Sequence, residues 1–320
     1  MIISASPMRI SMFGGGTDYE KHFSQYSSLV LGFAIKKFVY TTLRYTPKFF
    51  NHRTSVHYSK AEHVDDNTLI QNAPVRGSLQ YKGITDGLEI SHMADIFGKS
   101  GLGSSSAFIV GILNSLNQLL HDEAAPKMTL AEETIHIEQN ILKEKSGIQD
   151  GIWSSHGGVN SIEISKDGNF KVKPLPVTQE FLQQLNNNLV LFYTGGTRKS
   201  FEVAISQDTK TAESFKKQIQ QIAHEALAAF VKEDMVEIGK LLDESWQQKR
   251  KTSTLISTPK IDDLYNHAKR HSMIGGKILG AGGGGFMLCF TENRRKLIKN
   301  MDLFNTEFSF DFDGSKIILS

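Results

Sequence analysis

The stretch Lys99-Ser100-Gly101-Leu102-Gly103-Ser104-Ser105-Ser106-Ala107 carries the most information about the fold. It leads into apolar residues at helical spacing, so we expect a helix to begin near Ser105. Glycine lets the backbone approach a ligand closely. The first turn of a helix adds free N–H groups and the positive end of the dipole, which suit a polyphosphate. The stretch predicts a phosphate-binding loop, and the alternative is a flexible turn with a good N-cap.

Two better-known glycine patterns do not account for this chain. A Walker A loop would need a glycine where Met93 stands. Residues 280–285 match the dinucleotide pattern G-x-G-x-x-G, but the apolar strand expected at 286–290 follows them. A dinucleotide-binding fold requires a helix at that point. The motifs of protein kinases are absent as well.

The composition indicates a globular protein with one large or two medium domains. The chain has 320 residues, of which 39% are hydrophobic, and its formal net charge is +2 without a basic run. The only cysteine is Cys289, which excludes an intrachain disulfide. No apolar run approaches the roughly 18 residues of a membrane span, and the start lacks a signal peptide. We therefore expect a cytoplasmic protein without nucleic-acid or membrane partners, in which homo-oligomers are possible.

Periodicity places the elements in two α+β domains, 1–170 and 171–320, with the polar segment 168–180 as their boundary. A helix from Thr129 to about Lys143 is expected to start with a capping box. The tail alternates like a strand pair with Gly314 at its turn. The other expected strands lie at 30–44, 159–164, 189–193, 277–279 and 286–290, and the expected helices of the second half are centred near 222, 238 and 265.

Glu138 stands out on the expected helix by its position alone. It lies between Ile135, Ile141 and Leu142 at offsets of three and four residues, which puts a carboxylate on the apolar face. A buried carboxylate must be paired or must bind a metal ion. The alternative to a metal site is a structural ion pair.

Three motifs in order resemble those of the GHMP kinase superfamily over essentially the whole chain. They are the N-terminal stretch 7–19 with Gly14-Gly15-Gly16-Thr17-Asp18, the serine loop, and the C-terminal stretch 277–285. The resemblance implies a fold with an N-terminal domain like the second domain of ribosomal protein S5 and a ferredoxin-like C-terminal domain. The active site is then expected in the cleft between them.

Within the superfamily, the chain is most similar to the D-glycero-D-manno-heptose 7-phosphate kinases. The residues behind this resemblance are Ser146-Gly147-Ile148-Gln149-Asp150, Tyr193-Thr194-Gly195-Gly196-Thr197-Arg198, Trp246-Gln247-Gln248-Lys249-Arg250 and Ile261-Asp262-Asp263-Leu264-Tyr265. Galactokinases carry Glu-His where this chain has Gly15-Gly16. The implied reaction is transfer of the γ-phosphoryl group of ATP, with Mg²⁺, to the anomeric hydroxyl of the sugar phosphate.

The resemblance also assigns roles to single residues. Asp150 matches the catalytic aspartate, with Arg9 as the cation beside it, although an Asp-Gly turn would explain Asp150 without catalysis. Mg²⁺ is assigned to Ser105 and Glu138. The residues expected to bind ATP are Lys99, Ser100, Gly101, Leu102, Gly103, Ser104, Ser105 and Ser106, and those expected to bind the sugar are Gly15, Gly16, Thr17, Asp18, Arg198 and Gly283.

Several of these assignments have simpler structural explanations. Asp18 could cap a short helix, and the C-terminal glycine loop could be a packing turn between domains. Arg198, Lys199, Lys249 and Arg250 are the candidate cations for a substrate phosphate, with Arg198 favoured because it follows a glycine turn. The alternative functions are a kinase for another sugar such as fucose, a ligand sensor without catalysis, and RNA binding. The complete set Arg9, Ser105, Glu138 and Asp150 favours a kinase over a sensor.

Overall fold

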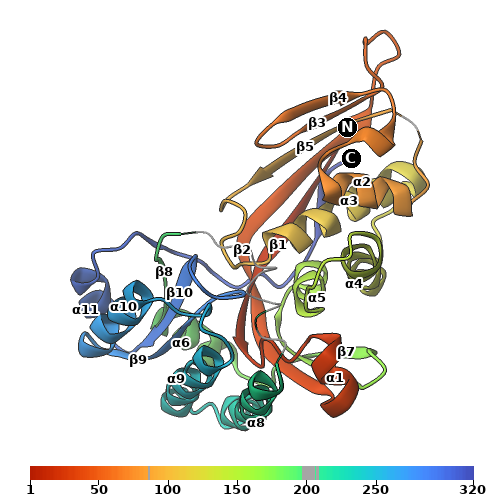
Figure 1. Ribbon diagram of the computed structural model, residues 1–320. Helices are drawn as coiled ribbons and strands as arrows, with labels where there is room; N and C mark the ends of the chain where they lie inside the picture. Colours follow the sequence, from red (N-terminus) through yellow and green to blue (C-terminus); the bar gives the residue numbers. More distant parts are fainter. Residues whose placement is uncertain (86, 197–205, 207–208) are drawn as a thin grey trace.

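The computed structural model describes residues 1–85, 87–196, 206 and 209–320 (Figure 1). They form two β-sheets with helices packed around each of them. The first sheet contains the long strands β1 (Ile2–Phe13) and β2 (Ser28–Tyr45). Its remaining strands are β3 (Thr54–His57), β4 (Ala61–Val64), β5 (Leu88–Ala94), β6 (Val159–Ile164), β7 (Phe170–Pro174) and β12 (Lys316–Leu319).

The first sheet has the strand order β12-β1-β2-β5-β3-β4, and β6 and β7 extend it from β2. All pairs are antiparallel except β3 with β5. Nearly every residue of β1 is buried, because helices cover the part of the strand that the second domain does not. The helices on this side of the molecule are α1 (Glu20–Tyr26), α2 (Ala73–Tyr81), α3 (Ser104–His121), α4 (Lys127–His136) and α5 (Gln149–His156), with short turns η1 (Asn67–Leu69) and η2 (Ile137–Ile141).

The second sheet has the antiparallel order β11-β8-β10-β9. Its strands are β8 (Leu189–Tyr193), β9 (Met273–Ile278), β10 (Phe286–Thr291) and β11 (Asn305–Thr306). Trp246, Tyr265 and Met287 are among the buried side chains of a separate apolar core at this sheet. The helices here are α6 (Gln179–Asn188), α8 (Lys210–Val231), α9 (Met235–Lys251), α10 (Pro259–Arg270) and α11 (Arg294–Asn300).

The structure places the domain boundary and the strands of the tail differently from the sequence prediction. A boundary between 170 and 171 falls inside β7, which pairs with β6 and keeps residues through Pro174 with the first sheet. The expected strand pair in the tail does not form. Instead, β11 pairs with β8 in the second sheet and β12 returns to β1 in the first. The two termini consequently lie side by side (Figure 1).

The predicted capping box at Thr129 is wrong. Helix α4 begins two residues earlier, at Lys127, and its N-cap Pro126 makes no side-chain hydrogen bond. Beyond His136 the expected helix continues as η2, a single π-helical turn. Such wide turns shift the side chains that follow them relative to a regular helix and are frequent at functional sites. Here the turn contains Glu138.

The two predicted glycine loops pack against each other at the junction of the domains. A Cβ on Gly101 would lie 2.6 Å from the carbonyl oxygen of Leu279, and one on Gly280 would lie 2.7 Å from Gly101 Cα. Both residues have positive φ angles, 85° and 67°. Only glycine fulfils both requirements, so the backbone of the second domain directly supports the loop of the first.

Candidate active site

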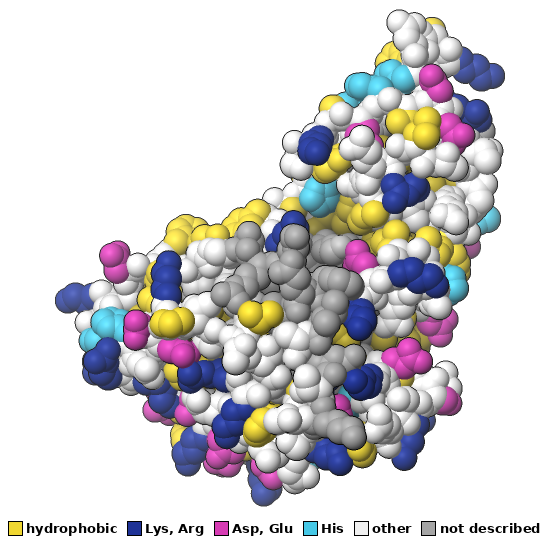
Figure 2. Space-filling model, in the orientation of Figure 1, with side chains coloured by type: hydrophobic (Ala, Val, Ile, Leu, Met, Phe, Trp, Pro, Cys, Tyr) yellow, Lys and Arg dark blue, Asp and Glu magenta, His cyan; other side chains and the backbone are white. Residues whose placement is uncertain are grey.

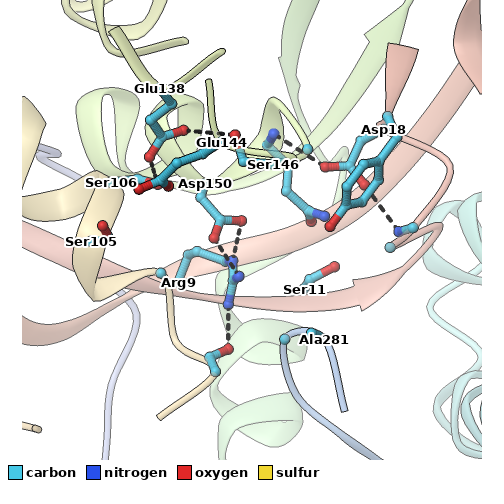
Figure 3. Close-up of a pocket in the computed structure, with 18 of the residues that line it drawn as sticks. Arg9, Ser11, Asp18, Ser105, Ser106, Glu138, Glu144, Ser146, Asp150 and Ala281 are labelled. Atoms are coloured by element: carbon cyan, nitrogen blue, oxygen red, sulfur yellow. Dashed lines mark hydrogen bonds and ion pairs between the residues drawn. The ribbon is translucent and has the colours of Figure 1, made fainter. Parts of the chain in front are cut away.

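A cavity of about 460 Å³ lies at the junction of the two domains. Residues from β1, α3, η2 and α5 line it on the side of the first domain, and Lys249, Lys277, Gly280 and Ala281 line it on the side of the second. In Figure 3, Glu138 and Ser106 lie at one end, Asp18 at the other, and Arg9 with Asp150 between them. The predicted interdomain site is therefore a real hollow lined with polar groups.

Arg9 and Asp150 form a bidentate ion pair inside this cavity. Arg9 Nε donates to Asp150 Oδ1 at 2.8 Å and Nη2 donates to Oδ2 at 2.6 Å. Arg9 Nη1 donates to the carbonyl oxygen of Gly101 at 2.6 Å, so the same guanidinium also holds the phosphate loop. Asp150 stands in the first turn of α5, and its side chain remains 24% exposed, towards the cavity. The alternative of a simple turn residue does not account for this pairing.

The predicted phosphate loop precedes α3 directly. Gly103, with φ 75°, is the N-cap of α3 and, as a glycine, provides no side-chain cap, so the first N–H groups of the helix remain available to a ligand. Six of the eight residues expected to bind ATP line the cavity: Lys99, Gly101, Gly103, Ser104, Ser105 and Ser106. Ser100 and Leu102 are buried beneath the loop, where their carbonyl oxygens accept from Phe286 N and Arg9 N.

Glu138 is buried as its sequence position indicated, with 2% of its surface exposed. Ser106 Oγ donates to Glu138 Oε1 at 2.5 Å and Ser146 Oγ to Oε2 at 3.3 Å. The partner of Glu138 is thus Ser106, and not Ser105, which is exposed. The two serines differ because the helical turn directs only one of them inward. Burial raises the pKa of Glu138 to about 8, since no cation compensates its charge among the described residues.

Asp18 is completely buried at the opposite end of the cavity. Its Oδ1 accepts from Gly16 N at 3.0 Å and its Oδ2 from Gln149 N at 3.4 Å, while the N-cap of α1 is Tyr19. Asp18 is therefore no helix cap. Burial and the neighbouring Asp150 raise the pKa of this carboxyl group.

The other residues expected to bind the sugar divide into two groups. Gly15 and Gly16 line the cavity beside Asp18. Thr17 does not, because its hydroxyl is buried and bonds to Gly14 O at 2.7 Å and Gln220 Oε1 at 3.0 Å. Gly283 is also outside the lining and donates its N–H to Ile256 O at 2.8 Å. In the C-terminal loop, Gly280 and Ala281 take the place at the cavity that was expected for Gly283.

The candidate cations are distributed unevenly. Lys249 lines the cavity, whereas Arg250 turns away and pairs with Asp262 at 2.8 Å. Arg198 and Lys199 lie outside the described residues. Lys277 also lines the cavity, although it was not among the cations expected from the sequence. The available signal was a lysine inside an otherwise apolar strand, directly before a glycine loop.

A loop and helix terminus suited to a polyphosphate thus face a carboxylate that can accept a hydroxyl proton, and this combination defines a phosphotransferase. Residues 70–158 match the family model for the GHMP kinases N terminal domain, and residues 226–301 match that for the GHMP kinases C terminal domain. The two regions cover more than half of the chain, which belongs to the GHMP kinase family. Kinases of this family use ATP as the phosphate donor.

Individual relatives extend the similarity to the full length. The chain is 25% identical to a D-glycero-alpha-D-manno-heptose 7-phosphate kinase of Campylobacter jejuni, over 98% of each sequence. It is 24% identical to a bifunctional fucokinase/GDP-fucose pyrophosphorylase of Arabidopsis thaliana, over 72% of this chain but 23% of that protein. The fold resembles a crystal structure of a D-glycero-D-manno-heptose 1-phosphate kinase from Bacteroides thetaiotaomicron, with a TM-score of 0.81, 22% identity, and coverage of 100% and 99%.

Acidic and basic side chains are interspersed on the face shown in Figure 2, without a continuous basic stripe. No helix among the described residues is both long and apolar enough to span a membrane.

Proposed function

We propose that this protein transfers the γ-phosphoryl group of ATP to the anomeric hydroxyl of D-glycero-D-manno-heptose 7-phosphate, giving the 1,7-bisphosphate and ADP. One observation gives the main support for phosphoryl transfer: the Arg9–Asp150 ion pair lies between the phosphate loop and Asp18. The full-length similarity to the Campylobacter jejuni heptose 7-phosphate kinase supports the choice of sugar.

Asp150 has the position and the environment of a general base. Two hydrogen bonds from Arg9 fix the orientation of its carboxylate. The sugar hydroxyl oxygen attacks the γ-phosphorus, the bond to the oxygen bridging the β- and γ-phosphates breaks, and the hydroxyl proton passes to Asp150. Arg9 balances the charge that this carboxylate and the transferring group carry.

Glu138 and Ser106 would hold the Mg²⁺ that accompanies ATP. A buried carboxylate flanked by two serine hydroxyls, with no cationic partner among the described residues, fits a divalent cation. Among the described residues, no three acidic, histidine or cysteine side chains are grouped so as to bind a metal by themselves. This fits Mg²⁺, which commonly takes one or two carboxylates and completes its coordination with phosphate oxygens and waters. Bound there, it neutralises charge on the polyphosphate.

Asp18 is the best candidate to bind sugar hydroxyls. Its oxygens are held by backbone N–H groups of Gly16 and Gln149, so its orientation is fixed before the sugar binds. The adjacent Gly15 and Gly16 leave space for a bulky ligand. A charge-assisted hydrogen bond from a sugar hydroxyl would be stronger than a neutral one.

Fucose is the alternative substrate with specific support. Two fucokinases, each part of a bifunctional protein, are 24% identical to this chain over 72% and 69% of its length. Fucose carries no phosphate, so it needs no cation at the end of the cavity away from ATP. The presence of Lys249 and Lys277 in the cavity favours the phosphorylated sugar.

An ADP-release assay across a panel of sugars tests this proposal. The panel contains heptose 7-phosphate, the unphosphorylated heptose, fucose, galactose and mevalonate, each with Mg²⁺-ATP. We expect the highest kcat/KM for heptose 7-phosphate. A higher value for fucose would establish the alternative, and no ADP release with any sugar would favour a ligand sensor.

A further inference from the structure

The wall of the cavity around Gly15 carries several polar groups that protein atoms leave unsatisfied. The position that a Cβ on Gly15 would occupy lies 2.8 Å from Ser11 Oγ and 3.8 Å from both Gln149 Nε2 and Lys277 Nζ. Ser11 Oγ and Gln149 Oε1 are buried without a hydrogen-bond partner among the described residues. A buried polar group without a partner costs free energy, so this wall is suited to a polar ligand.

The two lysines of the cavity also use only part of their hydrogen-bonding capacity. Lys277 is 3% exposed and donates to Met12 O at 2.9 Å, and Lys249 is 7% exposed and donates to Gly280 O at 2.5 Å. Neither forms an ion pair with a carboxylate in the part of the chain that the structure describes. An ammonium group has three N–H donors, so each lysine keeps two for a ligand.

The charges at this end of the cavity are unbalanced. Arg9 and Asp150 compensate each other, which leaves Lys249 and Lys277 facing Asp18. Burial and the proximity of other cations lower the pKa of both lysines, that of Lys249 to about 8. A phosphate monoester carries a charge of about −1.5 to −2 at neutral pH, which would compensate the excess.

The main chain holds the two lysines rigidly. Lys249 lies in the last turn of α9, three residues after the buried Trp246, and Lys277 pairs with Leu288 of β10 near the end of β9. Helix α9 approaches β9 very closely, since a Cβ on Gly275 would be 2.0 Å from Gly239 O. Two lysines fixed in this way can form a preorganised anion site.

We propose that Lys249, Lys277 and Ser11 form a subsite for the phosphate group that the acceptor sugar carries. This inference rests on the proposed function, because it assigns the 7-phosphate of the heptose to these residues. Under the proposed function, the polyphosphate of ATP would have other partners, namely the N-terminus of α3, Lys99 and the Glu138 site. Lys277, in contrast, faces the glycine turn beside Asp18, where the sugar is expected.

Substitution of the lysines by methionine tests the subsite, because methionine keeps the length of the side chain and removes its charge. In Lys277→Met and Lys249→Met we expect KM for heptose 7-phosphate to rise about 10- to 100-fold, the loss of a charged hydrogen-bonding group. KM for ATP and KM for unphosphorylated heptose should rise by a much smaller factor, so the loss is selective for the phosphorylated sugar. Ser11→Ala should raise KM for the phosphorylated sugar by a smaller factor. Lys240→Met is the matched control, an exposed lysine on the same helix.

The outcomes separate this inference from the proposed function. If wild type prefers heptose 7-phosphate and the variants lose both sugars or ATP equally, the subsite is wrong and the proposed function stands. If wild type does not use heptose 7-phosphate, the proposed substrate itself is wrong. Calorimetric titration of each variant with heptose 7-phosphate provides a second measurement, independent of turnover. Unchanged affinity in both lysine variants would overturn the subsite.

Discussion

Three buried or half-buried carboxylates share one cavity, and their neighbours give each a different property. Asp150 is held by a guanidinium, Asp18 by backbone N–H groups, and Glu138 by serine hydroxyls. Burial raises the pKa of Asp18 and of Glu138. Under the proposed function, the base, the sugar-binding group and the metal-binding group are three separate residues.

Asp150→Asn removes the proton acceptor while keeping the shape of the side chain. We expect kcat to fall at least about 10²-fold, the lower range for a general base, while KM for both substrates changes little. Steady-state ADP release with saturating Mg²⁺-ATP measures this effect. A kcat near that of wild type would exclude Asp150 as the base.

Glu138→Gln keeps the hydrogen bond from Ser106 and removes the negative charge. We expect the Mg²⁺ concentration needed for half-maximal activity to rise about tenfold or more, since one carboxylate is a large part of a Mg²⁺ site in a protein. KM for the sugar should be unchanged. Titration of activity with Mg²⁺ provides the measurement, and an unchanged requirement would contradict the assignment.

At the level of elements, the contact between the two glycine loops couples the domains. Gly101 belongs to the phosphate loop and Gly280 to the loop between β9 and β10, and their backbones touch. Within the first domain, Arg9 ties the same loop to α5 by bonding both Gly101 O and Asp150. A shift of the C-terminal loop would thus move the loop that we expect to bind ATP.

Gly101→Ala should disturb this contact in two ways. Its positive φ disfavours any residue with a Cβ, and the added methyl group would lie 2.6 Å from a backbone oxygen that cannot rotate away. We expect a loss of more than about 1 kcal/mol in unfolding free energy and a raised KM for ATP. Gly98→Ala is the control, because Gly98 is exposed in the same loop with nothing within 4 Å of its Cβ position. Urea denaturation measures the unfolding free energy of both variants. Equal losses of unfolding free energy would contradict the prediction.

Regular elements of this protein could be predicted from sequence far better than contacts between distant segments. The strands at 159–164 and 189–193 have the expected bounds, since alternation and β-branched residues are local signals. Ser105 was expected beside Glu138, whereas Ser106 makes the hydrogen bond, and Glu138 lies in a π turn that no local pattern indicates. Lys277 was missed for a related reason: only the packing of the second domain brings it to Asp18.

For the whole molecule, the return of the last strand to the first sheet makes the domains interdependent. β12 pairs with β1, the strand that carries Arg9, although most of the preceding chain belongs to the second domain. Phe310 also packs against Phe33 of β2. The first domain is therefore incomplete until the C-terminus is in place.

Deletion of residues 316–320 should lower the stability of the first domain. The strand contributes a few backbone hydrogen bonds, each worth about 0.5–1.5 kcal/mol, so we expect a loss of about 2 kcal/mol or more. The midpoint of urea unfolding measures it. Kinase activity should persist at low temperature, because the deleted residues are remote from the cavity. An unchanged midpoint would mean that β12 adds nothing to the first domain.

Because both domains line the cavity, the distance between their residues can decide which length of sugar phosphate reacts. Asp150 belongs to the first domain, whereas Lys249 and Lys277 belong to the second. Contacts between backbones fix the span between them, so under the proposed function the cavity would select sugar phosphates by the distance between their phosphate group and their anomeric hydroxyl. Mannose 6-phosphate lacks one carbon of the heptose, and its anomeric hydroxyl would fall short of Asp150 by about one bond length. Displacements of about 1 Å can cost 10²-fold in rate, so we expect a kcat lower by about that factor while the phosphate still binds. The ADP-release assay measures kcat for both sugar phosphates. Similar values would show that the cavity does not select its substrate by this distance.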